Sequence, residues 1–129
     1  MDIQEKALKL HDSGFNCAQS VLGACEEYTG LPAEKALAIS AGFGGGVRCG
    51  EICGAVSGAV MAMGMWYPFN DGADAEARNR ISKRTGELTR AFAKEFGCIR
   101  CQDLKRNGIP CDTLIAFAAK IAEEKMKEE

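Results

Sequence analysis

Seven cysteines in a chain of 129 residues are the side chains most able to do chemistry here, because packing alone rarely needs so many. Four of them lie far apart and in distinctive contexts: beside an asparagine, in a glycine-rich motif, in a Cys-x-x-Cys pair and after a proline. They are Cys17, Cys53, Cys101 and Cys111. Thiolates ligate zinc and iron–sulfur clusters, and they are also the reactive species in disulfide exchange. Sulfur chemistry is therefore where we look for a function.

Three of these cysteines are expected at the starts of helices. Asn16 is a favoured N-cap for a helix that begins at Cys17, and Pro110 suits the start of a helix that begins near Cys111. Cys53 is expected in the first turn of a helix that follows a glycine-rich stretch. The N–H groups and the dipole at a helix start stabilise a thiolate relative to a thiol. We therefore expect the reactive, metal-binding form of sulfur to be favoured at these positions.

The elements that must position these cysteines are helical. The sequence has almost no strand pattern, whereas apolar residues recur at helical spacing along most of its length. The pattern predicts one all-α domain over residues 1–129, a bundle of about five to seven helices. The expected helices cover residues 3–12, 17–29, 32–41, 51–66, 75–96, 98–106 and 111 to the polar tail.

Two groups of glycines are expected to let backbones approach closely. Four of the five residues from Gly42 to Gly46 are glycine, which predicts a tight connection. A phosphate-binding loop is disfavoured there, because no strand precedes the stretch and no Gly-Lys-Ser/Thr follows it. Gly54, Gly58 and Ala62 recur every four residues and form a strip against which another helix can pack. The glycines expected to bring the backbone close to a bound cofactor are Gly44, Gly45, Gly54 and Gly58.

Charge and composition exclude several classes of function. The formal net charge is −2 and both signs are mixed along the chain, so no basic surface for nucleic acid is predicted. The apolar run from Ile52 to Phe69 contains Ser57 and three glycines, and we interpret it as a buried core helix and not a membrane span. The polar N-terminus shows no secretory signal, so we expect a cytoplasmic protein whose thiols stay reduced.

The cysteines also allow paired arrangements. Cys98 and Cys101 form a Cys-x-x-Cys pair, and two residues three apart on a helical turn are close enough for a disulfide. Cys49 and Cys53 are four residues apart and are expected on one helix face. Together, the two pairs would suit a tetrahedral zinc site with four cysteine ligands.

Two further residues are expected to have structural roles. Cys25 follows Cys17 by two helical turns on nearly the same side, and we expect it to pack as a small hydrophobic residue. His11 is the only histidine and is expected near a helix C-terminus, where a cation is favourable. We interpret it as a surface or capping residue and not as a metal ligand.

The sequence resembles a known family, the small redox-active proteins named for a C…GCAxxG…C…C pattern (C_GCAxxG_C_C). The resemblance covers nearly the whole chain, because separated motifs occur in the same order. They are Phe15–Leu22, Phe43–Gly46, Ile52–Ala59 with its Cys-Gly-Ala-x-x-Gly motif, the stretch from Phe96 to Leu104, and Cys111. The four shared cysteines of the family correspond to Cys17, Cys53, Cys101 and Cys111. Outside that pattern fall Cys25, Cys49 and Cys98.

The resemblance implies a helical protein with redox-active cysteines and, because such genes often lie near transporter genes, a functional link to a transporter. It implies no particular reaction. Four thiolates suit a [2Fe–2S] or [4Fe–4S] cluster, or zinc. Our main hypothesis is therefore a metal site on the four shared cysteines, with an iron–sulfur cluster preferred to zinc. Such a site would serve electron transfer or redox sensing with a redox partner protein.

Two other hypotheses stay open. One is a thiol–disulfide exchange protein, an oxidoreductase that uses Cys98 and Cys101 or a long-range pair such as Cys17 and Cys53, with Arg100 as a cation that favours thiolate. The other is a non-catalytic helical interaction module, in which the Gly/Ala strip forms a homodimer surface and the cysteines mostly pack. An iron–sulfur protein purified without oxygen is brown, whereas the other two classes are colourless.

Overall fold

The computed structural model describes residues 1–128, which form helices and no β-strand. The all-α prediction is confirmed. These residues contain eight α-helices, six of them eight residues or longer. The number exceeds the expected five to seven because the helix expected over residues 17–29 is divided into two. In chain order they are α1 (Ile3–Asp12), α2 (Cys17–Ala24), α3 (Glu26–Thr29), α4 (Ala33–Ser40), α5 (Gly54–Trp66), α6 (Ala75–Phe96), α7 (Cys101–Arg106) and α8 (Cys111–Lys127).

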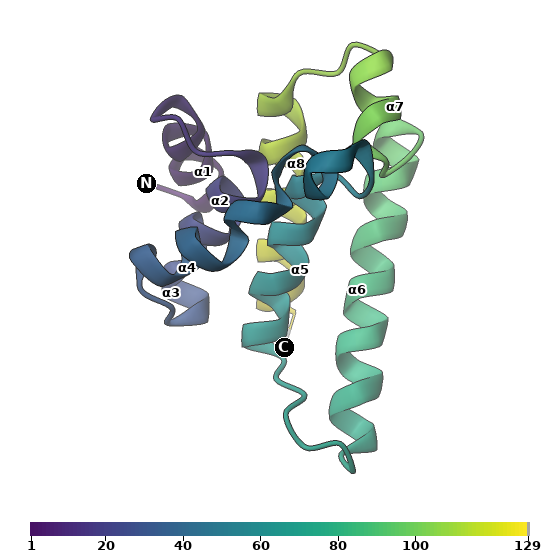
Figure 1. Ribbon diagram of the computed structural model, residues 1–129. Helices are drawn as coiled ribbons and strands as arrows, with labels where there is room; N and C mark the ends of the chain where they lie inside the picture. Colours follow the sequence, from purple (N-terminus) through teal and green to yellow (C-terminus); the bar gives the residue numbers. More distant parts are fainter. Residues whose placement is uncertain (129) are drawn as a thin grey trace.

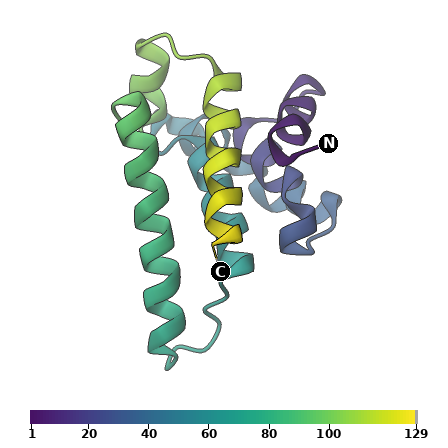
Figure 2. The same ribbon diagram turned by 180° about the vertical axis from the view of Figure 1, so that it is seen from behind.

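The long helices form one side of the molecule and the short N-terminal helices the other. Helices α5, α6 and α8 run alongside one another, whereas α1 to α4 pack together beside α5 and α8 (Figures 1 and 2). Helices α5 and α8 both begin at the end of the bundle that carries α7 (Figure 1). A short 3-10 turn (Ala41–Phe43) and an irregular helical segment (Gly46–Gly50) connect α4 to α5 at this same end.

Helix α5 is the centre of the core because its small residues admit other helices. Gly54, Ala55, Gly58 and Ala62 are all buried, and α5 packs on α2, α6 and α8. A Cβ at Gly58 would lie 2.6 Å from the carbonyl oxygen of Ala18 in α2, so only glycine permits this approach. The strip predicted from the sequence is therefore used for packing within the chain.

Helices α6 and α8 close the other side of the core through aromatic side chains. Phe92 and Phe96 on α6 contact each other edge to face, with 4.9 Å between ring centroids. Phe117 on α8 contacts both rings in the same manner, at 6.1 and 5.2 Å. These contacts fix the end of α6 and the first half of α8, and so help to set the positions of α7 and of the α8 start.

One expected helix is divided in the structure. The helix predicted over residues 17–29 is interrupted at Cys25, where φ is −94° and ψ is 17°. The chain then forms the single turn of α3, which ends at Gly30 in the left-handed conformation (φ 69°). Cys25 is fully buried, as its expected packing role requires.

Two other helices begin later than predicted, for a shared reason. Helix α5 begins at Gly54 and not near Glu51, and α7 begins at Cys101 and not at Cys98. The residues just before each helix are extended and hydrogen-bond to each other, with an isolated antiparallel bridge between Ile52 and Arg100. This pairing between distant segments competes with helix formation, and it has no local signal in the sequence.

The long apolar run around α5 is a core element, as expected. No helix within residues 1–128 combines the length and apolar character that crossing a bilayer requires. Val56, Ala59 and Met63 on α5 are almost completely buried among the other helices.

The glycine strip of α5 gives a direct test of the packing. We predict that Gly58→Ala destabilises the protein by about 1–3 kcal/mol, because its methyl group would overlap the Ala18 carbonyl. Gly64→Ala in the same helix meets no atom within 4 Å, so it should stabilise by up to about 1 kcal/mol through helix propensity. Chemical denaturation of both variants checks this pair, and equal effects would contradict the close approach of α2 and α5.

A four-cysteine cavity as the candidate functional site

The four cysteines of the sequence pattern line one cavity, at the end of the bundle where α5 and α8 begin. The cavity has a volume of about 160 Å³. Its cysteines are Cys17, Cys53, Cys101 and Cys111. The other lining residues are His11, Asn16, Gly45, Gly54, Lys105, Ile109 and Leu114. Residues separated by most of the chain are thus brought to one place.

Each of the four cysteines stands at the start of a helix. The first residues of α2, α7 and α8 are Cys17, Cys101 and Cys111, and Cys53 is the N-cap of α5. The first N–H groups of a helix have no partner within it and carry partial positive charge. At Cys53, the backbone N–H groups of Ala55 and Val56 donate hydrogen bonds to the sulfur. The wall of the cavity therefore contains backbone N–H donors as well as thiol sulfurs.

Asn16 positions Cys17 and ties α2 to the glycine-rich connection. Its side-chain oxygen accepts a hydrogen bond from the N–H of Gln19 at 3.0 Å, and the Gln19 side chain accepts one from the Asn16 N–H, which completes a capping box. The Asn16 amide nitrogen donates to the carbonyl oxygen of Ala41 at 2.9 Å. Gly44 lies directly on this side chain, since a Cβ there would come within 2.4 Å of Asn16 Cγ.

A short antiparallel pairing positions Cys53 and Cys101 together. The N–H of Cys53 donates to the carbonyl oxygen of Ile99 at 2.8 Å, and the N–H of Cys101 donates to that of Glu51 at 2.6 Å. The side chains of Glu51 and Arg100 form an ion pair at 3.2 Å outside this pairing. The starts of α5 and α7 are therefore held side by side by backbone hydrogen bonds.

The connection before α5 contains a left-handed turn that packs against Cys101. Gly45, Gly46, Val47 and Arg48 all have φ between 57° and 66°. A Cβ at Gly46 would lie 2.5 Å from the Glu51 nitrogen and 2.8 Å from Cys101 Cβ. Glycine is thus required at Gly46 by both its conformation and its contacts. Val47 is β-branched, and the left-handed conformation is strained for such a residue.

Burial, and not the helix starts, decides the ionisation of two of the thiols. Burial raises the pKa of Cys17, and the nearby thiols of Cys111 and Cys53 raise it further, because their thiolates would repel one another. Burial also raises the pKa of Cys53, although the N–H groups of Ala55 and Val56 partly oppose this. The expectation that helix starts favour thiolate at these two positions was therefore wrong for the protein without a bound cation.

The three cysteines outside the family pattern do not line the cavity. Cys49 is exposed and its Sγ donates to the Gly46 carbonyl oxygen at 3.5 Å, so it does not share a helix face with Cys53 as expected. Cys98 is half-buried and precedes α7, so Cys98 and Cys101 do not lie on one helical turn. Cys25 lies in the core, where burial and the charges of Glu123 and Glu27 raise its pKa to about 12.

The four glycines expected near a cofactor divide into two pairs. Gly45 and Gly54 line the cavity. Gly44 instead packs on Asn16, and Gly58 packs on Ala18 one turn further along α5. A Cβ at Gly54 would lie 3.4 Å from Cys17 Cβ, so Gly54 sets the separation between the first and second cysteines.

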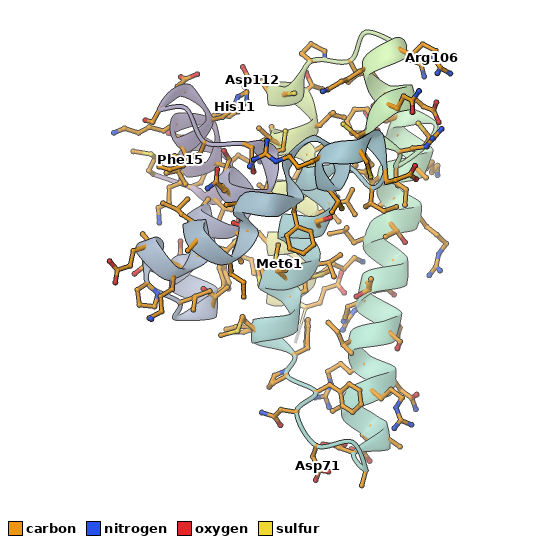
Figure 3. All side chains as sticks on the ribbon, viewed as in Figure 1. His11, Phe15, Met61, Asp71, Arg106 and Asp112 are labelled. Carbon is orange, nitrogen blue, oxygen red and sulfur yellow. The ribbon has the colours of Figure 1, made fainter. Side chains whose placement is uncertain are left out.

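Two charged or polar residues of the cavity wall were missed by sequence reasoning. His11, expected at a surface or cap, lies in the last turn of α1 and lines the cavity, with its Nδ1 2.7 Å from Asp112 Oδ1 (Figure 3). Lys105 on α7 also lines the cavity. His11 reaches the cavity wall because α1 packs on α8, and the sequence carries no signal for that packing. The same packing places His11 beside Asp112.

The cavity does not have the geometry of a site for a single ion. Within residues 1–128, no group of three or more histidine, cysteine, aspartate or glutamate side chains is arranged to hold one metal ion. All seven cysteines are free thiols. The four sulfurs therefore share a cavity without surrounding a common point at bonding distance.

Comparison with known protein families agrees with the four-cysteine pattern. The family model described as "Putative redox-active protein (C_GCAxxG_C_C)" matches residues 15–125. The chain belongs to this family. The matched region begins just before Asn16 and includes all four cysteines of the cavity. No curated protein and no solved structure matches the chain.

The raised pKa values predict a pH dependence for the metal-free protein. The folded thiols of Cys17 and Cys53 keep their protons above 9.0, the ordinary thiol value, whereas thiols of the unfolded chain ionise there. The free energy of unfolding should therefore fall as pH rises above 9.0, by at most about 1.4 kcal/mol per pH unit for each thiol. Denaturation with reductant present measures this slope, which should be shallower in Cys17→Ser, and an unchanged slope in that variant would contradict it.

The burial of the cysteines predicts their order of alkylation. In the native, metal-free protein, Cys49 should react with iodoacetamide first because it is exposed. Cys25 should react last, because it is fully buried and its pKa is raised to about 12. Timed mass spectrometry of peptides gives the order, and early modification of Cys25 would show that the core described here is wrong.

Proposed function

We propose that this protein is a redox protein that binds an iron–sulfur cluster and exchanges single electrons with a partner protein. The proposed ligands are Cys17, Cys53, Cys101 and Cys111. The observation that carries the proposal is the convergence of these four thiols, from four separate helix starts, on one cavity. Membership of a redox-active family supports the same chemistry.

The donor set fits a cluster better than a single zinc ion. In a tetrahedral zinc site with Zn–S bonds of about 2.3 Å, the sulfurs would lie roughly 3.8 Å apart, around one point. The described residues hold no such arrangement. A cluster distributes its cysteine ligands over two or four irons, so the sulfurs can stand further apart around a larger body. The cavity of about 160 Å³ between the thiols supports this choice.

The electrostatics of the cavity also suit a bound cationic metal core. Without one, burial and mutual repulsion keep Cys17 and Cys53 protonated, so the protein alone does not support several thiolates together. Iron ions would supply the missing positive charge, and the thiol protons would leave on binding. A cluster with four thiolates supplies one-electron chemistry. The N–H groups of Ala55 and Val56 would then stabilise the sulfur of Cys53, and hydrogen bonds to sulfur raise the affinity for an electron.

The different exposure of the four cysteines suggests where an electron crosses. Cys53 and Cys101 are 2% and 9% exposed and belong to the interior of the protein. Cys17 and Cys111 are half-buried and stand nearer to solvent. We infer that a redox partner approaches the side formed by Cys17, Cys111 and the neighbouring Lys105, because electron transfer favours the shortest path between centres.

Anaerobic purification tests the proposal. The wild-type protein should be brown and contain iron and acid-labile sulfide in near-equal amounts, and Cys53→Ser or Cys111→Ser should lose both, because each removes a ligand. Cys49→Ser and Cys98→Ser are matched controls, since both cysteines lie outside the cavity and should leave the iron content unchanged. Circular dichroism of each variant separates loss of a ligand from loss of the fold.

Two results would overturn the proposal. One is a wild-type protein that stays colourless and iron-free after reconstitution with ferrous iron and sulfide under reducing conditions. The other is an iron content that falls equally in Cys49→Ser and Cys53→Ser. Thiol–disulfide exchange would then be the better-supported function.

A further inference from the structure

Among the four thiols of the cavity, Cys17 and Cys111 are neighbours. The Cys111 side chain lies near enough to that of Cys17 to contribute to the raised pKa of the Cys17 thiol. The two residues are the first of α2 and α8, and these helices pack against each other. Thiols that line one cavity from two packed helix starts can reach the disulfide bond length of about 2.05 Å by side-chain rotation and a small shift of the helix starts.

Cys17 and Cys111 are also more accessible to a soluble oxidant than the other two cysteines of the cavity. Cys17 and Cys111 are half-buried, whereas Cys53 and Cys101 are buried. Cys53 is also restrained, because its sulfur accepts hydrogen bonds from two backbone N–H groups and its own N–H is bonded to Ile99. A soluble disulfide must contact a sulfur to react with it. The two neighbouring thiols at the starts of α2 and α8 are therefore also the accessible ones.

We propose that oxidation of the metal-free protein joins Cys17 to Cys111 in a disulfide, which removes two of the four thiols from the cavity and prevents metal binding. The part of this proposal that concerns the metal rests on the proposed function, whereas the disulfide itself does not. This pair differs from Cys98–Cys101 and from Cys17–Cys53, the pairs that sequence reasoning favoured.

The reaction is a two-electron exchange with a low-molecular-weight disulfide such as glutathione disulfide. One thiol of the pair loses its proton and attacks the glutathione disulfide, which releases one glutathione thiolate and leaves a mixed disulfide. The second thiol then attacks the protein sulfur of that mixed disulfide, forms the Cys17–Cys111 bond and releases the second glutathione. The protein loses two protons and two electrons, and both are recovered in two molecules of reduced glutathione.

The bond would connect α2 and α8, the first and last helices that contribute a cysteine to the cavity. It closes a loop that contains most of the chain, so it should stabilise the fold against denaturation. A metal-free protein would thus be held in a stable, oxidised form until a dithiol reductant restores both ligands. The metal site would then be lost when disulfide oxidants predominate around the protein and restored when thiol reductants do.

Disulfide mapping of the oxidised protein tests the inference. Metal-free wild-type protein is treated with glutathione disulfide, its remaining thiols are alkylated, and its peptides are identified by mass spectrometry. We expect a Cys17–Cys111 peptide as the main cross-link and a raised melting temperature. Cys17→Ser and Cys111→Ser should lose the cross-link and the stabilisation, and Cys98→Ser should keep both. The oxidised protein should also take up no iron from ferrous iron and sulfide until it is reduced with dithiothreitol.

The outcomes separate this inference from the proposed function. A main cross-link between Cys98 and Cys101, or one that includes Cys49, with Cys17 and Cys111 alkylated, would overturn the inference even if the reduced protein binds a cluster. Full iron uptake by the cross-linked protein would overturn its effect on metal binding. If the reduced protein takes up no iron, the proposed function fails, and the disulfide map alone then decides whether this pair is the site of oxidation.

Discussion

The close approach of α5 to α2 is the constraint on which the rest of the structure depends. Gly58 lies against the backbone of Ala18, and Gly54 lies against Ala18 and Cys17. This contact places the start of α5 beside the start of α2, and so places Cys53 near Cys17. Side chains at either glycine would separate the two helices and open the cavity. The motif Cys-Gly-Ala-x-x-Gly thus combines a sulfur with the small residues that bring a second sulfur close to it.

A second constraint is the balance between burial and charge in the cavity. Helix starts favour negative charge, yet the pKa values of Cys17 and Cys53 are raised by loss of hydration, which at Cys53 outweighs the N–H groups of Ala55 and Val56. A cavity with several neutral thiols has two ways to gain stability: a metal core that neutralises thiolates, or a disulfide that removes thiols. Disulfide formation is itself an oxidation, and an iron–sulfur core would supply one-electron chemistry, so either use of the cavity suits a redox-active family.

Much of the fold could be predicted because its signals are local. Asn16 caps α2 and Pro110 immediately precedes α8, as their positions in the sequence indicated. The start of α5 could not be predicted from its neighbours, because it is set by hydrogen bonds from Cys101 to Glu51 and from Cys53 to Ile99. The left-handed conformation of Val47 likewise has no signal in a residue type that avoids it.

The four cysteines that line the cavity could be singled out together from the sequence, but their surroundings could not. The four cysteines were recognisable from the family resemblance, whereas the place of His11 in the wall depends on how α1 packs on α8. The raised thiol pKa values were also missed, because burial is a property of the whole fold and the helix-start argument considers one element at a time.

The central claim is that four distant cysteines hold one polynuclear iron site, and X-ray absorption at the iron edge of the anaerobically prepared protein tests it most directly. We predict a first shell of sulfur alone and a second iron atom at short distance from each absorbing iron. A first shell of oxygen or nitrogen, or iron without an iron neighbour, would contradict it.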